Sequence, residues 1–260
     1  MAPPRRPSLP RPALVAVAHG SRDPRSAATV AALIDTVRAR RPDLDARLSF
    51  LDLTAPRLLD ALDAVAADGH RSTVVVPLLL SSAYHARVDI PRAVAAATRR
   101  LPRLEIAVAP VLGSRPALLG AIAMRRLAAV AGPLHDPDLG VVLAAVGSSH
   151  SPANAAVGRV VSTWARRFGW HGGGPAFATT TAPTVSDAVA ALRASGARRV
   201  AVAQWILAPG LLPDRIVRDA TAAGALVGAP LGADPDVARA VLARYDTRIA
   251  ARPIPGHLIA

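Results

Sequence analysis

The sequence predicts two tandem, similar α/β domains, each a small parallel sheet flanked by helices. One observation is an internal repeat, in which the second half matches the first at a constant offset of 127 residues (145 minus 18). Another is the alternation, within each half, of strand-length apolar runs with stretches whose apolar residues follow a helical spacing. Because strands that alternate with helices are joined by right-handed crossovers, both sheets are expected to be parallel.

The two copies differ most informatively at two histidines. His19 falls on Val146 and His85 falls on Leu212, so one copy carries imidazoles where the other carries aliphatic side chains. The segments that do match are Ala18-His19-Gly20-Ser21 with Ala145-Val146-Gly147-Ser148, residues 54–56 with 181–183, Phe50 with Phe177, Asp60 with Asp187, Gly69 with Gly196, Arg71 with Arg198 and Leu80 with Leu207. The chemistry is therefore expected in the first copy.

Each element of the first half has its own signal. Strands are expected at residues 13–18, 46–51, 74–80 and 105–108, and helices at residues 26–40, 55–67 and 90–100. The fully apolar run at 74–80 is typical of a central parallel strand. Thr54 and Pro56 suit the cap and first turn of the second helix, and Gly69 is expected to end it.

The second half repeats this order, with strands near residues 141–146, 174–178, 200–206 and 225–228. Leu112-Gly113 pairs with Leu231-Gly232 at an offset of only 119 (231 minus 112), so the second copy is shorter. The expected organisation is a disordered tail at 1–12, an N-terminal domain at 13–117, a linker helix and turn at 118–138, a degenerate repeat at 139–250 and a tail at 251–260.

Composition excludes several classes of site. Hydrophobic residues make up 52% of the chain, which is enough for two cores, and there is no cysteine. Disulfides, iron–sulfur clusters and zinc–thiolate sites are therefore excluded, and a reducing cytoplasm is the expected location. The apolar runs are far too short to cross a bilayer, so no membrane partner is expected.

The formal net charge is +13, and every basic side chain other than histidine is an arginine. Guanidinium groups match carboxylates and phosphates in geometry. The arginines are scattered singly, without interleaved aromatic residues or a known nucleic-acid motif. A small polyanionic substrate is therefore expected, and no nucleic acid.

The two histidines mark a candidate site. His19 directly follows the first expected strand, and His85 follows the third by a short loop. In an open parallel sheet, ligands bind beyond the carboxyl ends of the strands. Two neutral imidazoles at one rim make a weak, open metal site, or a metal ligand paired with a base.

Other residues near the histidines suit a ligand. Gly20 and Ser21 allow the backbone to approach one closely. Asp89 could orient His85 or cap the helix that begins near Pro91. Arginines that could pair with substrate carboxylates are Arg22, Arg25, Arg87 and Arg92. No catalytic role is expected for the five remaining histidines, His70, His135, His150, His171 and His257, of which His150 lies nearest the rim of the second copy.

Two segments resemble the long, duplicated form of the sirohydrochlorin chelatases, the class II tetrapyrrole chelatases that include cobalamin-pathway cobaltochelatases and sirohaem ferrochelatases. They are Ala18-His19-Gly20-Ser21-Arg22-Asp23 and residues 77–91, which read Pro-Leu-Leu-Leu-Ser-Ser-Ala-Tyr-His-Ala-Arg-Val-Asp-Ile-Pro. Residues 206–214 are similar to the degenerate copy of that family. The resemblance covers the chain from residue 13 to about residue 250.

The resemblance implies a lyase that inserts Fe²⁺ or Co²⁺ into sirohydrochlorin, a polycarboxylate tetrapyrrole, for sirohaem or cobalamin biosynthesis. Of the two metals, iron is slightly favoured. His19 and His85 would be the catalytic residues and the metal ligands. The residues expected to bind the substrate are Ser21, Arg22, Ser81, Ser82, Tyr84 and Arg87. No cofactor is implied beyond the substrate metal, and the internal pseudo-dimer favours a monomer.

Two other classes of function stay open. A non-catalytic tetrapyrrole or metal carrier would bind the macrocycle without accelerating metallation. A histidine phosphatase also places His-Gly at a strand end, but arginine precedes its phosphoryl-accepting histidine, whereas Ala18 precedes His19 here.

Overall fold

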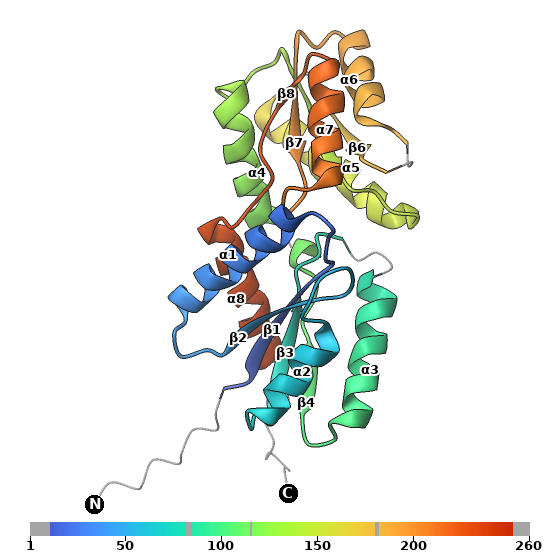
Figure 1. Ribbon diagram of the computed structural model, residues 1–260. Coiled ribbons are helices and arrows are strands. Elements are labelled where there is room, and N and C mark those ends of the chain that lie inside the picture. The colour runs from blue at the N-terminus through green and yellow to red at the C-terminus, as the bar shows by residue number, and fades with distance from the viewer. Residues whose placement is uncertain (1–10, 82–84, 115, 180–181, 252–260) are drawn as a thin grey trace, which may run out of the picture.

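The computed structural model describes residues 11–81, 85–114, 116–179 and 182–251. They form two α/β halves, one above the other in Figure 1. The first sheet has the order β2-β1-β3-β4 and the second has the order β6-β5-β7-β8. All strand pairs in both sheets are parallel, which confirms the predicted fold class.

The strands lie close to their predicted positions. They are β1 (Ala13–Ala18), β2 (Ala46–Phe50), β3 (Ser72–Pro77), β4 (Glu105–Val108), β5 (Leu139–Ala145), β6 (Gly172–Phe177), β7 (Arg199–Gln204) and β8 (Leu226–Val227). The central strands β1 and β5 are buried along their whole length, because helices cover both faces of each sheet.

The helices are α1 (Pro24–Arg40), α2 (Leu58–Ala67), α3 (Ile90–Arg100), α4 (Pro116–Ala131), α5 (Ser151–Phe168), α6 (Val185–Ala194), α7 (Leu211–Ala222) and α8 (Pro235–Ala250). A π-helical turn, η1 (His85–Asp89), precedes α3, and a 3₁₀ turn, η2 (Leu112–Ser114), precedes α4. Helix α1 begins where the Asp23 carboxylate accepts the N–H of Arg25, followed by Pro24 in the first turn.

Two predicted caps are wrong. Helix α2 begins at Leu58 and not near residue 55, and its first turn is completed by Asp60, which accepts the N–H of Arg57. The Thr54 hydroxyl instead bonds to the backbone of Ser21. Asp89 precedes α3, but its side chain makes no capping hydrogen bond. The Thr54 hydroxyl therefore stabilises a contact between two loops and does not cap α2.

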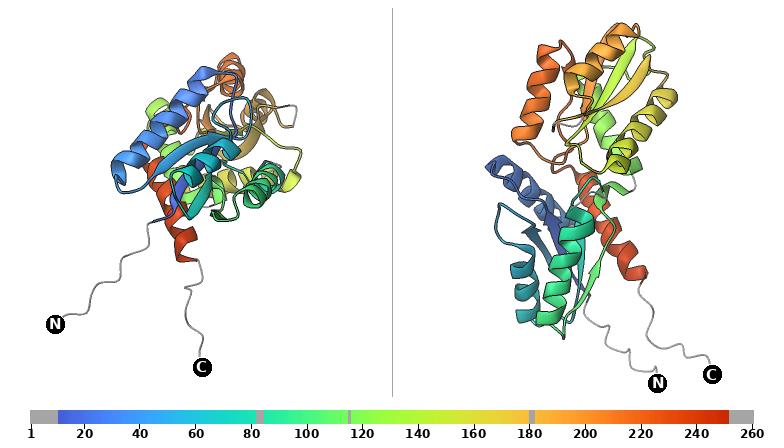
Figure 2. Two further views of the ribbon diagram at one scale, coloured as in Figure 1. Left: turned by 60° about the horizontal axis from the view of Figure 1, so that its bottom comes forward. Right: turned by 90° about the vertical axis from the view of Figure 1, so that its right-hand side faces the viewer.

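The two halves exchange helices. Helix α4 leaves the first half and packs on β7 and β8 of the second sheet, whereas α8, at the far end of the chain, packs on α1 and β3 of the first. Figure 2 shows α8, in red, running beside the first sheet. The sequence prediction places the linker at residues 118–138 and the second domain at 139–250. In the structure, α4 of the predicted linker packs on the second sheet, and α8 of the predicted second domain packs on the first sheet.

One hydrophobic core is continuous through both halves. It joins α1 and α8 on the first sheet to α4 and α5 on the second, and includes the fully buried Leu33, Leu127 and Tyr245. Separate clusters pack α2 and α3 on the outer face of the first sheet and α6 and α7 on that of the second. Within the described ranges, no helix combines the length and the apolar character that a membrane span requires.

Candidate functional site

His19 and the start of η1 follow two neighbouring strands of the first sheet. His19 comes directly after β1 and is exposed, and His85 is the first residue of η1, beyond the loop that follows β3. Strand β1 lies between β2 and β3, so the chain turns to opposite sides of β1 at this point. Such a switch point opens a crevice at the carboxyl ends of the strands, where ligands bind.

The predicted site falls partly outside the described residues. Ser82 and Tyr84 are among the undescribed positions, as is the side chain of His85. Ser81 and Arg22 are described and exposed, and Ser21 is half-buried. The prediction that His19 and His85 form a pair therefore rests on where their backbones lie.

The loop that carries His19 packs directly on the loop that follows β2. The N–H of Asp52 donates to the carbonyl oxygen of His19 at 2.9 Å. Gly20 has a φ of +97°, and a Cβ atom there would lie 1.7 Å from the carbonyl oxygen of Asp52. Only glycine combines that backbone conformation with that approach. Leu53 is the one non-glycine residue with a positive φ (61°) in the described chain, so the contacting loop is also strained.

Asp52 is a candidate site residue that the sequence interpretation missed. The Arg57 guanidinium donates to its Oδ1 atom at 2.8 Å and holds the pKa of the Asp52 carboxyl below its usual range. The N–H of Leu53 and the charge of His19 lower this pKa further. At the repeat offset Asp52 corresponds to Thr179, so the same asymmetry that marks the histidines also marks this carboxylate.

A hydrogen-bonded network fixes the segment that follows His19. The Thr54 hydroxyl accepts the N–H of Ser21 and donates to its carbonyl oxygen, both at 3.1 Å. The Ser21 hydroxyl accepts the N–H of Asp23 at 3.0 Å. These bonds hold the start of α1, and with it His19, in one position.

Arg25 does not face a substrate as predicted. Its guanidinium binds the buried carboxylate of Asp23 and reaches Asp214 at the start of α7 in the other half. These two carboxylates raise the pKa of Arg25, and the hydrogen bonds from Arg25 lower the pKa of Asp23. Arg25 is therefore a structural link between the halves.

A second link between the halves lies at the matching place in the repeat. Arg87 in η1 donates to Nε2 of His150 at 3.0 Å, and His150 directly precedes α5. At the offset of 127 residues, Arg87 corresponds to Asp214 and His150 corresponds to Asp23. Two links at matching places in the repeat thus join the halves. One is the ion-pair network of Arg25 with Asp23 and Asp214, and the other is the hydrogen bond from Arg87 to His150.

A large cavity opens beside this second link. It has a volume of about 1470 Å³, lies between α4 and α5, and reaches Ser81, Arg87 and His150 at one end. His150 was expected to have no catalytic role, and the structure shows that it lines this cavity. Arg87 and Ser81, both predicted to bind substrate, line it as well.

The described part of the rim brings a histidine and a carboxylate-bearing residue together. An imidazole and a carboxylate, His19 and Asp52, lie together, and both are ligands for divalent first-row metals. Among the described side chains, no group of three His, Cys, Asp or Glu gathers to hold a metal. The described part of the rim therefore joins His19 and Asp52 through their backbones, and the Asp52 carboxylate is bound to Arg57.

Comparisons with known proteins show the family of this chain. The CbiX family model matches residues 13–129 and 140–248. Sirohydrochlorin cobaltochelatase of Priestia megaterium is 25% identical over 206 residues, 77% of this chain and 65% of that protein, slightly under two thirds of its length. Sirohydrochlorin ferrochelatase of Bacillus subtilis (strain 168) is 25% identical over 207 residues, 80% of this chain and 78% of that protein.

A solved structure shows the same architecture. SirB from Bacillus subtilis with Fe³⁺ superposes with a TM-score of 0.79 and covers 92% of this chain and 96% of its own. The sequence identity of 23% means that this likeness concerns the fold. Both halves of the described chain therefore share one known two-domain arrangement.

Proposed function

Because this chain belongs to the CbiX family of sirohydrochlorin chelatases, we propose that it inserts a divalent metal ion, Fe²⁺ or Co²⁺, into sirohydrochlorin. The observation that carries the proposal is the position of His19 and of the first residue of η1, His85, beyond the carboxyl ends of β1 and β3. The second copy has Val146 and Leu212 there, so the family fold alone does not require histidines.

In the proposed mechanism, His19 and His85 hold the substrate metal at the rim and present it to one face of the macrocycle. Metal insertion displaces two pyrrole protons, and an imidazole that has released the metal ion can accept one of them near neutral pH, since the unperturbed pKa of histidine is about 6.5. A site of few nitrogen and oxygen ligands, without thiolate, binds the ion loosely enough to release it to the four macrocycle nitrogens.

Asp52 adds an oxygen ligand and a negative charge beside His19. Its carboxylate stays ionised because Arg57 and the N–H of Leu53 stabilise the charged form. A carboxylate there would raise the affinity for a divalent cation at low cost, since it needs no deprotonation. Asp52 is therefore placed with His19 and His85 in the metal-holding set.

The substrate carboxylates have arginine partners close by. Arg22 is exposed next to Ser21, and Arg87 faces the cavity at the opposite side of the rim. Arginine pairs with carboxylates in a bidentate geometry, which orients a flat polycarboxylate as well as binding it. Iron and cobalt suit the same ligands, and the two relatives are named for different metals, so both belong to the proposal.

The test is anaerobic absorbance of sirohydrochlorin mixed with Fe²⁺ or Co²⁺. Native protein is expected to accelerate metallation, and a His19→Ala/His85→Ala double variant is expected to lose the acceleration while keeping its fold. A Val146→Ala/Leu212→Ala variant changes the matching positions of the second copy and is expected to metallate at the native rate. Binding of the macrocycle by native protein without acceleration would establish a carrier instead.

A further inference from the structure

The cavity between α4 and α5 lies beside α5, whereas the corresponding helix of the first half, α1, is packed against another helix. There α8 packs on α1, and Leu33 and Val37 of α1 are fully buried. At the repeat offset these residues correspond to Val160 and Trp164 of α5, which are only partly buried and line the cavity. The second half therefore leaves open, beside α5, a place that the first half fills with a helix.

The walls of this groove differ in chemistry. The α4 wall consists mainly of small side chains, Ala117, Gly120, Ala121 and Ala128, with Met124 among them. A Cβ atom on Gly120 would lie 2.6 Å from the Trp164 ring, so glycine makes room for the indole. The Trp164 ring therefore fills the space beside Gly120, and the other small residues of α4 line the open part of the groove.

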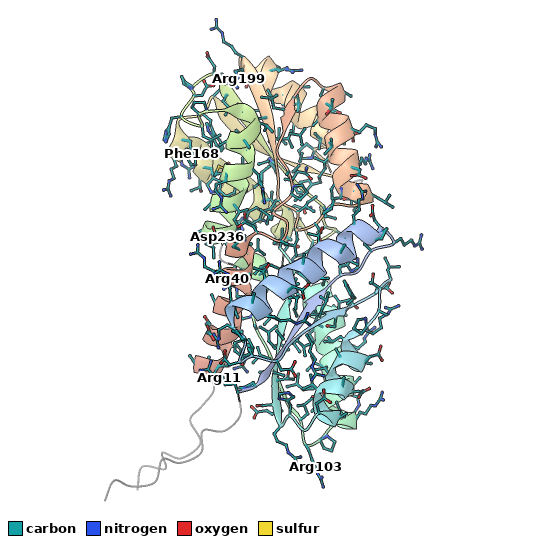
Figure 3. All side chains as sticks on the ribbon, turned by 60° about the vertical axis from the view of Figure 1, so that its left-hand side comes forward. Arg11, Arg40, Arg103, Phe168, Arg199 and Asp236 are labelled. Atoms are coloured by element: carbon teal, nitrogen blue, oxygen red, sulfur yellow. The ribbon has the colours of Figure 1, made fainter. Side chains whose placement is uncertain are left out.

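Aromatic rings gather at the groove although the chain has few of them. Of three tryptophans and three phenylalanines, Trp164, Trp205 and Phe168 line it. Trp164 and Trp205 meet edge to face with ring centroids 5.9 Å apart. Phe168, labelled in Figure 3, stacks on Trp170 with ring centroids 5.3 Å apart. Trp205 is buried, whereas Trp164 and Phe168 are partly exposed, and partly exposed rings bind flat, apolar ligands by stacking and area burial.

Arginines line the open edge of the groove. Arg159 and Arg167 lie two turns apart on α5, about 12 Å along the helix axis. Both are exposed, and neither guanidinium has an ion pair or hydrogen bond within the described parts of the chain. Arg125 on α4 is already paired with Asp234 and Asp236. Apart from Arg87 at the end near the rim, the groove arginines without a carboxylate partner among the described residues are therefore those of α5.

We propose that the groove between α4 and α5 binds the tetrapyrrole as a holding site next to the metal-holding rim. The macrocycle would lie against the small residues of α4 and the Trp164 and Trp205 rings, with its carboxylates on Arg159 and Arg167. The inference rests on the proposed function, since that function supplies a flat polycarboxylate ligand. The volume of about 1470 Å³ exceeds the roughly 300–1,000 Å³ of ordinary small-molecule pockets, as a ligand of this size requires.

The groove also explains what the degenerate half contributes. His19 does not line it, whereas Ser81, Arg87 and His150 connect its end to the rim. In this arrangement the first half holds the metal and the second half holds the macrocycle. The loss of histidines from the second copy is then compatible with a retained, different role.

The experiment measures the Kd of metal-free sirohydrochlorin by quenching of tryptophan fluorescence in the full chain. Arg159→Gln/Arg167→Gln removes the cations, and Ala121→Trp fills the groove from an exposed position on α4. Each change is expected to weaken binding about tenfold or more. Two control variants lie outside the groove, Arg166→Gln/Arg198→Gln with the same change in charge and Ala129→Trp on the same helix. Both are expected to stay within about twofold of native, and circular dichroism verifies folding.

The outcomes separate the two proposals. Native Kd values in both folded groove variants would overturn the holding site and leave the chelatase proposal standing. Failure of the native protein to bind the macrocycle would overturn both. A native dimer in sedimentation that Ala121→Trp dissociates would show that the groove is an interface between copies, and would also overturn the holding site. Macrocycle binding by His19→Ala/His85→Ala at native Kd, without metallation, is the result expected for separate sites.

Discussion

Arg87 donates a hydrogen bond to Nε2 of His150 at 3.0 Å, and this bond crosses from the first half of the chain to the second. A guanidinium has donors only, so Nε2 of His150 is the acceptor of this bond. On the other side of the rim, the matching place of the repeat holds carboxylates, Asp214 and Asp23, bound to Arg25.

The first prediction concerns this link. A double-mutant cycle of Arg87→Ala and His150→Ala is expected to show a coupling energy of about 0.5–1 kcal/mol in urea unfolding, a modest value because Arg87 is exposed. Strict additivity of the two single variants at neutral pH would show that the bond contributes nothing.

Asp52→Asn tests the carboxylate beside His19. The variant keeps the shape of the side chain but removes its charge, so the KM for the metal ion is expected to rise about tenfold. The Kd of metal-free sirohydrochlorin should stay native, because Asp52 is not placed against the macrocycle. Asp35→Asn, an exposed carboxylate on α1, is the matched control. An unchanged metal KM in Asp52→Asn would remove it from the metal-holding set.

Gly20 and Gly69 form a matched pair for the loop contact. Both have a positive φ, +97° and +87°, but a Cβ atom on Gly69 would meet nothing within 4 Å. Gly69→Ala is therefore expected to cost only the backbone strain, roughly 1–2 kcal/mol. Gly20→Ala must also displace the carbonyl of Asp52, so its loss of stability should be clearly larger and metallation should fall with it. Equal denaturation midpoints for the two variants would contradict the contact.

Tyr245 predicts how stability depends on alkaline pH. The side chain is fully buried, and burial raises its pKa to about 12, whereas the unfolded chain ionises near the ordinary value of about 10. The neutral phenol is thus favoured by folding, and its contribution is complete below about pH 10 and is lost as the pH rises through about 12.

The measurement is the free energy of unfolding of native protein and of Tyr245→Phe across that range. The native value should fall between about pH 10 and about pH 12 more steeply than that of the variant. At neutral pH the variant should be less stable by about 1 kcal/mol, since the Tyr245 hydroxyl donates to the carbonyl of Pro12. Parallel curves for the two proteins would show that the phenol does not carry the effect.

The sequence predicted the sheets and the rim well, because apolar runs and the repeat report local structure directly. His19 and His85 follow β1 and β3 as expected. Thr54 was misinterpreted because the same hydroxyl that caps a helix can also bind a loop, here at Ser21, which lies 33 residues away. The hydrogen bond from Arg87 to His150 depends on how the two halves pack together, and a local sequence pattern does not predict that packing. Asp52 carried a usable signal, since Thr179 replaces it in the second copy.

The packing of α8 on the first sheet could not be predicted from the sequence for a similar reason. Its apolar residues, among them Val237, Val241 and Tyr245, indicate a buried helix but do not specify which sheet buries it. The same holds for α4, whose small residues suit tight packing and, in the structure, line a groove instead.

The exchange of α4 and α8 also means that the first half cannot complete its packing until the end of the chain has been synthesised. The first sheet is complete once β4 has been made, at Val108, yet the helix that covers α1 and β3 extends from Pro235 to Ala250. On the ribosome, the early half must therefore wait without the helix that packs on α1 and β3 while the later half is translated. Chaperone binding to nascent chains should accordingly persist through most of translation and end only when α8 has left the exit tunnel.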